Sequence, residues 1–388
     1  MDPCQSRRPD AGAPLHGRNH LQDRRALATG RLEVELEEDL GRPAVAERRS
    51  PSTGSPMNLN RRNYPPEHGI RIPFGDLKKL LVTLFESVNT SSEDANLLAS
   101  ILTRNNQRCL YSHGTGQVPY YLQRIKDGDV NPRPNVTVVQ EAAASIVMDG
   151  DGGLGYFPCY HGTMKAIEKA KQGGIAAVTT RNHQHVGSAG NYTRLALEHD
   201  CIGISASSHR THLNPDSLIF SVVDSSPSSI AVPAGEQPPL VMDMGGGLVR
   251  FEEELFERIP TTYFKVMAFT AAVRALAGVF PGIYRQEFVD SPWEANQGAF
   301  IAIVDVAHFM PLEELKSEMD RFIAEARATQ PLPGMETAEL AGGNEWTWAK
   351  DNEKNGIPMS DDHVIQLQDE ADKLGVETPF AKFEHTRF

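Results

Sequence analysis

Apolar residues recur at helical spacing where the regular pattern of the chain begins. Over residues 76–88 they follow one another at intervals of three and four, at Leu77, Leu80, Leu81, Leu84 and Phe85. This periodicity predicts an amphipathic helix with one buried face. Thr90 and Glu93 match a capping box, which predicts a second helix up to Gln107. A third helix is expected over residues 117–127.

Farther along, short apolar runs typical of strands alternate with longer helical patterns. The expected strands are residues 136–139, 145–148, 175–180, 202–207, 240–244 and 300–304. The expected helices among them are residues 158–172, 188–199 and 261–277. Alternation of this kind predicts an α/β protein in which helices cover a sheet. Two more helices, residues 311–329 and 361–374, are expected near the C-terminus.

Charge and composition narrow the class of protein. The formal net charge is −13, whereas a nucleic-acid-binding protein needs a basic face for the phosphates. No window approaches the roughly 20 uninterrupted apolar residues of a membrane helix. The four cysteines have no paired spacing along the sequence: they are Cys4, Cys109, Cys159 and Cys201. This pattern indicates free thiols in a reducing compartment. We therefore expect no nucleic-acid partner, no membrane span and a cytoplasmic location.

Residues 1–56 differ in composition from the rest of the chain. They are rich in arginine and in acidic residues, and they contain no lysine. They lack the hydrophobic core of a secretory signal, and the acidic run 33–39 is unlike a transit peptide. This composition predicts a disordered extension ahead of the folded part.

One glycine-rich segment matches the pattern of a dinucleotide-binding loop. Gly150, Gly152 and Gly155 satisfy G-x-G-x-x-G between an expected strand and an expected helix. Asp151 lies inside the loop and would repel a pyrophosphate. Glu168 lies within the expected helix, whereas a ribose-binding acid ends a second strand. A plain turn is therefore the preferred interpretation.

Two histidines in glycine-flanked turns are the main candidates for chemistry. His185 follows the expected strand 175–180, and His113 lies upstream beside Gly114. Because an unperturbed imidazole titrates near neutral pH, such a pair suits proton transfer. Each could instead be a surface or structural histidine. The glycine cluster after Asp243 ends another strand, where the backbone could approach a cofactor closely.

An ordered set of short motifs connects these features to a known family. The set comprises residues 112–114, 120–121, 124–128, 149–155, 185–192, 202–205, 243–244, 265, 276–279, 296–298, 345–346 and 356–358. Over residues 72–380 the chain resembles the malate/L-lactate dehydrogenase-like oxidoreductases, which include ureidoglycolate, sulfolactate and diketogulonate dehydrogenases.

The resemblance implies a fold and a mode of assembly. Enzymes of this kind have an α/β fold whose NAD(P)-binding core is a mixed sheet and not a Rossmann sheet. Residues 131–307 would form this cofactor-binding core. Residues 72–130 would pair with residues 308–380 in a helical domain. The family generally forms homodimers.

The resemblance also implies an activity and its site residues. The reaction is hydride transfer between NAD or NADP and a small 2-hydroxy or 2-oxo acid, or a cyclic imine acid. By position, His185 matches the acid/base residue and His113 the second active-site histidine. Gln117 and Tyr121 fall at substrate-binding positions. The positions that would bind the cofactor are His209, Asp243, Met244, Gly245, Lys265, Asn296, Gly342, Gly343 and Asn344.

Several positions depart from the pattern of that family. Where Gln117 stands the family usually has an arginine, so a charged clamp for a substrate carboxylate becomes a neutral hydrogen bond. The family's Lys-Gly-Tyr-Gly reads Lys-Val-Met-Ala from Lys265, and the interval between Asp243 and Lys265 is short. These departures favour one alternative, a protein with the family fold and impaired catalysis.

A second alternative is a metal-dependent enzyme. Its ligands would be His183, His185, His209 and His212, whose spacings are compatible with ligation. No carboxylate or cysteine completes an obvious set. The main interpretation therefore includes no metal.

Overall fold

The computed structural model describes residues 63–388, so the extension expected over residues 1–56 lies outside the described residues. The described residues cluster as one compact unit. Most of the expected strands and helices are present in it, within a few residues of their expected bounds.

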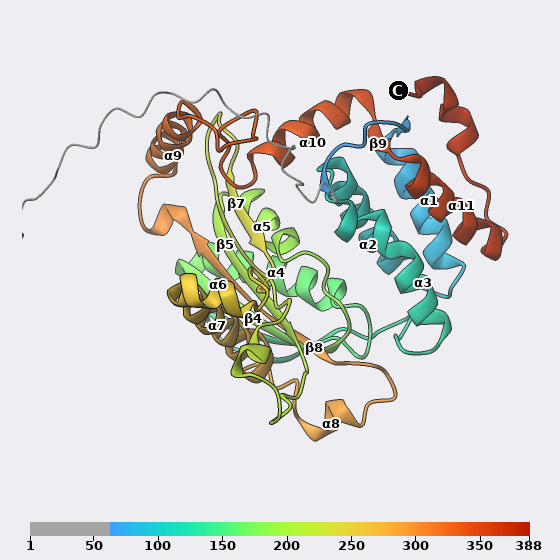
Figure 1. The fold of residues 1–388 in the computed structure, drawn as a ribbon. Coiled ribbons are helices and arrows are strands. Elements are labelled where there is room, and N and C mark those ends of the chain that lie inside the picture. The colour runs from blue at the N-terminus through green and yellow to red at the C-terminus, as the bar shows by residue number, and fades with distance from the viewer. Residues whose placement is uncertain (1–62) are drawn as a thin grey trace, which may run out of the picture. The chain divides into compact units, whose positions relative to one another are not determined.

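A seven-stranded mixed sheet forms the centre of this unit (Figure 1). Its strands are β2 (Thr137–Glu141), β3 (Ser145–Asp149), β4 (Ile175–His183), β5 (Cys201–His209), β6 (Ser228–Val232), β7 (Leu240–Met244) and β8 (Gln297–Asp305). They lie in the order β2-β3-β4-β8-β5-β6-β7. Only β3 and β4 are parallel neighbours within the described strands. The expected mixed, non-Rossmann sheet is confirmed.

Helices cover both faces of the sheet. They are α4 (Tyr156–Gly173), α5 (Gly190–Leu197), α6 (Glu253–Arg258) and α7 (Pro260–Arg274), the last continued by a π-helical turn at Ala275–Val279. In Figure 1, α4 and α5 lie on one face and α6 and α7 on the other. The expected helix over residues 261–277 therefore corresponds to α7 and its π-helical end.

A second group of helices, here called the helical layer, packs beyond α4 and α5. Its members are α1 (Phe74–Glu86), α2 (Ser92–Gln107), α3 (Val118–Lys126), α10 (Gly343–Asn355) and α11 (Asp361–Leu374). All five apolar residues that predicted the first helix are buried in α1. A two-stranded sheet of β1 (Ile70–Ile72) and β9 (Ile357–Met359) joins the start of this layer to its end. The sequence did not predict these two strands, which have three residues each.

The remaining short elements connect these parts. They are the 3-10 turns at Tyr111–His113, Thr115–Gln117, Ile219–Val222, Val306–His308 and Phe380–Thr386, together with α8 (Gln286–Val289).

Two helix starts differ from the expectation. The cap of α2 is Ser91, whose hydroxyl accepts a hydrogen bond from the Asp94 N–H at 3.1 Å. The predicted capping box from Thr90 to Glu93 was therefore wrong by one residue, because the extended Ser91 precedes the first helical turn. Helix α4 begins at Tyr156 and not at residue 158, since Pro158 fits the first turn of a helix.

Helix α9 (Leu312–Arg327), expected to join the other C-terminal helix in the helical domain, lies elsewhere. Its Asp320 carboxylate accepts hydrogen bonds from the N–H groups of residues 235–237, just before β7. Figure 1 shows α9 apart from α11. Helix α10, which the sequence did not predict, occupies the layer instead. The division of the chain into domains stays a prediction.

The glycine-rich segment between β3 and α4 packs tightly against protein. A Cβ on Gly152 would lie 2.2 Å from the Trp293 ring, and a Cβ on Gly155 would lie 2.6 Å from the Gln184 carbonyl oxygen. Gly152 has a φ of +70°, which glycine adopts without strain. Protein atoms fill the space that a phosphate would need, and this supports the interpretation as a turn.

His183, one of the histidines of the metal hypothesis, is a fully buried residue at the end of β4. Its Nε2 lies 2.8 Å from Thr180 Oγ1, and its Nδ1 lies 2.8 Å from the Gln184 carbonyl oxygen. Burial lowers the pKa of His183 to about 4, because the charged imidazolium would lose its hydration. The folded protein therefore keeps this ring neutral.

The buried ring makes stability depend on pH. An unfolded histidine has a pKa near 6.5, so the unfolded chain binds an extra proton between that pH and about pH 4. The free energy of unfolding should therefore fall as the pH is lowered through this window, by about 3 kcal/mol from His183. Urea titrations at pH 7 and pH 4 should show a smaller loss for His183→Gln than for the wild type. Equal losses would contradict this assignment.

Candidate active site

A hollow of about 380 Å³, here called the active pocket, opens where β4, β5 and β7 end and β8 begins. Because β8 is antiparallel to β4 and β5, its first residue lies beside their last ones. The pocket wall contains six of the residues expected at the site, namely His113, His185, His209, Asp243, Met244 and Gly245. Segments that are distant in the sequence thus meet at one edge of the sheet.

The two expected catalytic histidines face each other in the active pocket. Their ring centroids are 6.0 Å apart. His185 comes from the turn after β4, and His113 comes from the 3-10 turn that follows α2. One proton-transfer group therefore comes from the sheet and the other from the helical layer.

A buried pair of tyrosines holds the His185 ring. His185 Nδ1 lies 2.6 Å from the Tyr121 hydroxyl, which lies 3.1 Å from the Tyr156 hydroxyl. Both tyrosines are fully buried, and the Gln184 side chain accepts a hydrogen bond from the His185 N–H at 2.8 Å. With Nδ1 engaged, Nε2 is the ring nitrogen left to exchange a proton in the pocket.

Burial keeps the His185 imidazole neutral. It lowers the pKa of His185 to about 4, and repulsion from His113 and His183 adds to the shift. Burial also raises the pKa of Tyr121 well above its ordinary value, so its hydroxyl keeps its proton. That hydroxyl can donate to Nδ1 or accept from it. His185 can therefore act as a base at neutral pH and remain hydrogen-bonded after it takes a proton.

Asp243 presents a carboxylate at the end of β7. The Ser188 hydroxyl donates to its Oδ2, and Arg194 approaches the same oxygen at 3.7 Å. Both contacts use Oδ2, so Oδ1 can accept a hydrogen bond from a ligand. A second hollow, of about 470 Å³, shares Asp243 and is lined by Gly342 and Asn344 at the start of α10.

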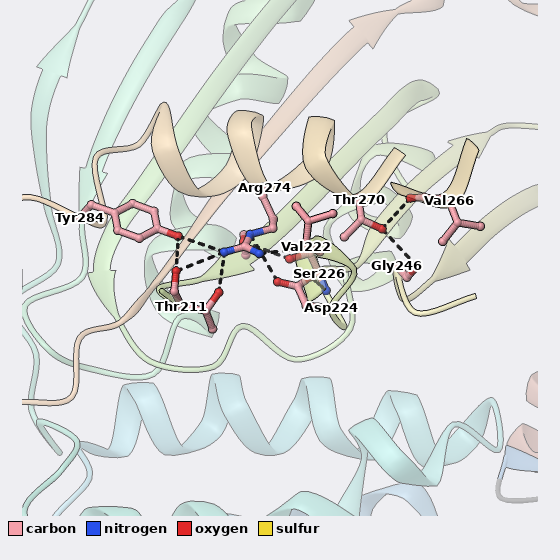
Figure 2. A network of polar contacts seen from close by, with 10 residues as sticks. Thr211, Val222, Asp224, Ser226, Gly246, Val266, Thr270, Arg274 and Tyr284 are labelled. Carbon is pink, nitrogen blue, oxygen red and sulfur yellow. Dashed lines mark hydrogen bonds and ion pairs between the residues drawn. The ribbon is translucent and has the colours of Figure 1, made fainter. Parts of the chain in front are cut away.

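Helix α7 makes polar contacts with two segments that adjoin the active pocket (Figure 2). Arg274 donates to the Thr211 hydroxyl at 2.6 Å, and its Nε lies 3.6 Å from the Asp224 carboxylate. One turn earlier, the Thr270 hydroxyl donates to the Gly246 carbonyl oxygen at 3.3 Å. Ser225 and Gly245, which line the pocket, are the direct neighbours of Asp224 and Gly246. Two side chains of one helix thus fix both segments.

Five expected site residues take other positions. Tyr121 lies behind His185 and not in the wall of the pocket. The Gln117 amide donates to the Ser112 carbonyl oxygen at 2.6 Å, which steadies the turn that carries His113. Lys265 is exposed on α7, and Asn296 donates to Glu294 just before β8. Gly343 begins α10 but, unlike its two neighbours, lines neither hollow.

Other residues of the site were not anticipated. The wall also includes Ser207 and Ser208 of β5, Gln297 of β8, and Asn63. Tyr156 supports Tyr121 from the start of α4. The alternation of side chains along a strand could have placed one β5 serine at this edge, but no sequence signal pairs the two tyrosines.

Cationic side chains do not reach the active pocket in the described part of the chain, where its wall has neither arginine nor lysine. Arg124 pairs with Asp129 and Glu294, and Arg210 donates to the Ile283 carbonyl oxygen. A substrate carboxylate would therefore meet imidazoles and hydroxyls, together with any cation from outside residues 63–388.

The metal hypothesis gains no geometric support. Within residues 63–388, no three histidine, cysteine or acidic side chains are arranged to hold a metal ion. His183 is engaged in the core, and the His212 ring packs against Tyr284, with the ring centroids 6.0 Å apart. Only His185 and His209 of the four line the pocket.

The helices within residues 63–388 can also be compared with a membrane span by length and hydropathy. None of these helices is both long enough and apolar enough to cross a bilayer.

Comparison with known proteins agrees with this geometry. A family described as malate/L-lactate dehydrogenase matches residues 72–253 and 256–368. Malate dehydrogenase of Pyrococcus horikoshii is 28% identical over 356 residues, covering 81% of this chain and 99% of that protein. Its solved structure superposes with a TM-score of 0.71 over 81% of this chain and 98% of that one. L-sulfolactate dehydrogenase of Methanocaldococcus jannaschii is 26% identical and covers 77% of this chain and 96% of that protein. The chain belongs to the malate/L-lactate dehydrogenase family.

Proposed function

We propose that the protein oxidises a small 2-hydroxy acid, or reduces the matching 2-oxo acid, with NAD or NADP. One observation carries the proposal. The neutral His185 ring is held by the buried Tyr121 and faces a pocket that also contains His113 and Asp243. The names of the relatives, malate and L-sulfolactate dehydrogenase, agree with a hydroxy acid of this size.

The two hollows that share Asp243 suit an elongated dinucleotide. Their volumes of about 380 and 470 Å³ lie in the usual range for ligand sites. Asp243 Oδ1 can accept a hydrogen bond from a ribose hydroxyl. A Cβ on Gly245 would make only an ordinary contact, 3.6 Å from the Ser225 carbonyl oxygen, so the backbone here is not crowded. A bound nicotinamide would supply the hydride acceptor or donor. Asp243, Met244, Gly245 and Asn344 are the residues that would hold the cofactor.

Proton transfer falls to His185. In oxidation Nε2 accepts the hydroxyl proton while a hydride leaves the same carbon, and in reduction the imidazolium returns that proton. Tyr121 keeps Nδ1 hydrogen-bonded in both states. This intact arrangement weighs against the alternative of a family-fold protein without turnover.

The proposal is tested by separating turnover from cofactor binding. One of NAD, NADH, NADP and NADPH should raise the melting temperature, because a ligand at 100 times its Kd adds about 2.7 kcal/mol. His185→Gln should lower kcat at least about 100-fold while this stabilisation stays nearly unchanged. His385→Gln, at an exposed position, is the matched control. No stabilisation by any of the four nucleotides would contradict the proposed function.

Substrate preference should respond to residue 117. The active pocket lacks arginine and lysine among its described lining residues, so we expect weak turnover of malate and lactate. Gln117→Arg replaces the amide that contacts the Ser112 carbonyl oxygen with a longer, charged side chain beside the His113 turn, and it should raise kcat/KM for them about tenfold, equivalent to about 1.4 kcal/mol. Gln123→Arg adds the same charge at an exposed site of α3 and should have no effect. An unchanged kcat/KM in Gln117→Arg would show that the carboxylate binds elsewhere.

A homodimer is proposed as the working form. Four aromatic rings form a continuous row from the turn at Ile219–Val222 to α7. Consecutive ring centroids of Phe220, Phe251, Phe256 and Phe264 are 5.6 to 6.0 Å apart. Phe264 is 57% exposed, and Ile219, next to Phe220 in the sequence, is 73% exposed. Apolar clusters of this kind commonly mark subunit interfaces.

The assembly is tested by the mass in solution. Light scattering at micromolar concentration should give twice the mass of the chain, and Phe264→Glu should shift it toward the monomer because the charge would be buried at the interface. Phe322→Glu, on the exposed part of α9, should leave the mass unchanged. A fully active wild-type monomer would contradict the proposal.

A cytoplasmic location is part of the same proposal. Cys109, Cys159 and Cys201 are free and buried, and unpaired thiols of this kind suit a reducing compartment.

A further inference from the structure

A third hollow lies between α2 and α5, away from the two histidines. Its volume is about 210 Å³. One part of its wall is apolar, formed by Leu97, Ile101, Tyr160, Tyr192 and Leu195. The other part carries three arginines, Arg104, Arg108 and Arg194, and a single carboxylate, Glu198. We call this the arginine hollow.

The positive charge of the arginine hollow is only partly neutralised. Glu198 pairs with Arg104 at 2.7 Å. Arg194 approaches Asp243, on the side of the active pocket, at 3.7 Å. The Arg108 side chain has no hydrogen bond or ion pair with any residue in the 63–388 range, although Glu198 and Glu345 act on it at longer range. One guanidinium therefore lacks a direct partner.

Two further groups in this wall have unused hydrogen-bonding capacity. Asn191 is 8% exposed, and its Nδ2 has no hydrogen-bond partner within the described residues. Arg194 is 9% exposed, and its NH1 makes no hydrogen bond there either, although it forms the 3.7 Å ion pair with Asp243. Buried donors are normally paired, so each such group calls for a partner.

The state of Arg108 agrees with an uncompensated charge. Burial lowers the pKa of Arg108 to about 9, and repulsion from Arg194 and Arg104 adds to the shift. Arg108 is partly exposed, and a partly buried charge without a partner still destabilises a fold. An anion beside Arg108 would remove this cost.

We propose that the arginine hollow binds a small oxyanion, a phosphate or a carboxylate, between Arg108 and Arg194. Guanidinium groups match both oxyanions through paired N–H donors. The apolar part of the wall, around Leu97 and Ile101, suits an organic anion with an apolar body. The site is separate from the active pocket, because the two hollows share no lining residue.

Direct binding to the purified full-length protein tests the proposal. Isothermal titration would use sodium phosphate and sodium benzoate as probes, with sodium chloride keeping the ionic strength constant. At least one probe should bind saturably to the wild type. Arg108→Met should weaken that binding at least about tenfold, which corresponds to the loss of one charged contact.

Two control variants place the binding in this hollow. Arg321→Met removes a charge from the exposed surface of α9 and should leave binding unchanged. His185→Gln alters the active pocket and should also leave it unchanged, so the result does not depend on the proposed dehydrogenase activity.

A second measurement remains informative if binding is weak. In anion-free buffer, Arg108→Met should melt at a higher temperature than the wild type, because it removes an unpaired, partly buried charge. Adding the bound probe should raise the melting temperature of the wild type more than that of the variant. The proposal is overturned if neither probe binds the wild type saturably, or if Arg108→Met binds the probe as tightly as the wild type does.

Discussion

The hydrogen bond between Tyr121 and His185 joins the two parts of the folded unit at the point where chemistry is expected. Tyr121 belongs to α3 in the helical layer, whereas His185 follows β4 of the central sheet. The 2.6 Å contact forms only when the layer and the sheet are correctly placed. His113, from the same layer, faces the ring under the same constraint. The proton-transfer site is therefore complete only when the layer packs against the sheet.

Several buried polar groups lie at the same edge of the sheet, and they contribute little to the free energy of unfolding. His183 and His185 are both kept neutral by burial, and Arg274 is held among loop atoms by several hydrogen bonds. A fold selected for stability alone would place apolar side chains at such positions. Their presence here is explained by the need to fix a base, its supporting tyrosines and the wall of the pocket in one geometry.

Much of the fold follows from local sequence signals, because periodicity and turn residues act over short distances. The five apolar residues of α1 are buried as predicted, and strand β7 has its expected bounds. That His113, His185 and Asp243 lie together could be predicted only from the family resemblance. Residue spacing does not reveal that β8 begins where β4 and β5 end.

Other features depend on tertiary contacts that no local pattern encodes. Gln117 lies at the sequence position expected for a substrate-binding residue, yet its amide donates a hydrogen bond to the Ser112 carbonyl oxygen. Helix α10 has a mostly polar surface and only Gly343 and Asn352 buried, so its periodicity was too weak to detect. Arg108, which follows α2, and Arg194 of α5 are far apart along the chain but line the same hollow.

The central claim is that burial against Tyr121 keeps His185 a neutral base. The most direct measurement is an NMR titration of the histidine ring signals in the full-length protein, with His185→Gln used to assign the resonance. The structure predicts a pKa of about 4 for His185, well below the ordinary value of 6.5. A midpoint near 6.5 would show a solvated imidazole and would contradict the account.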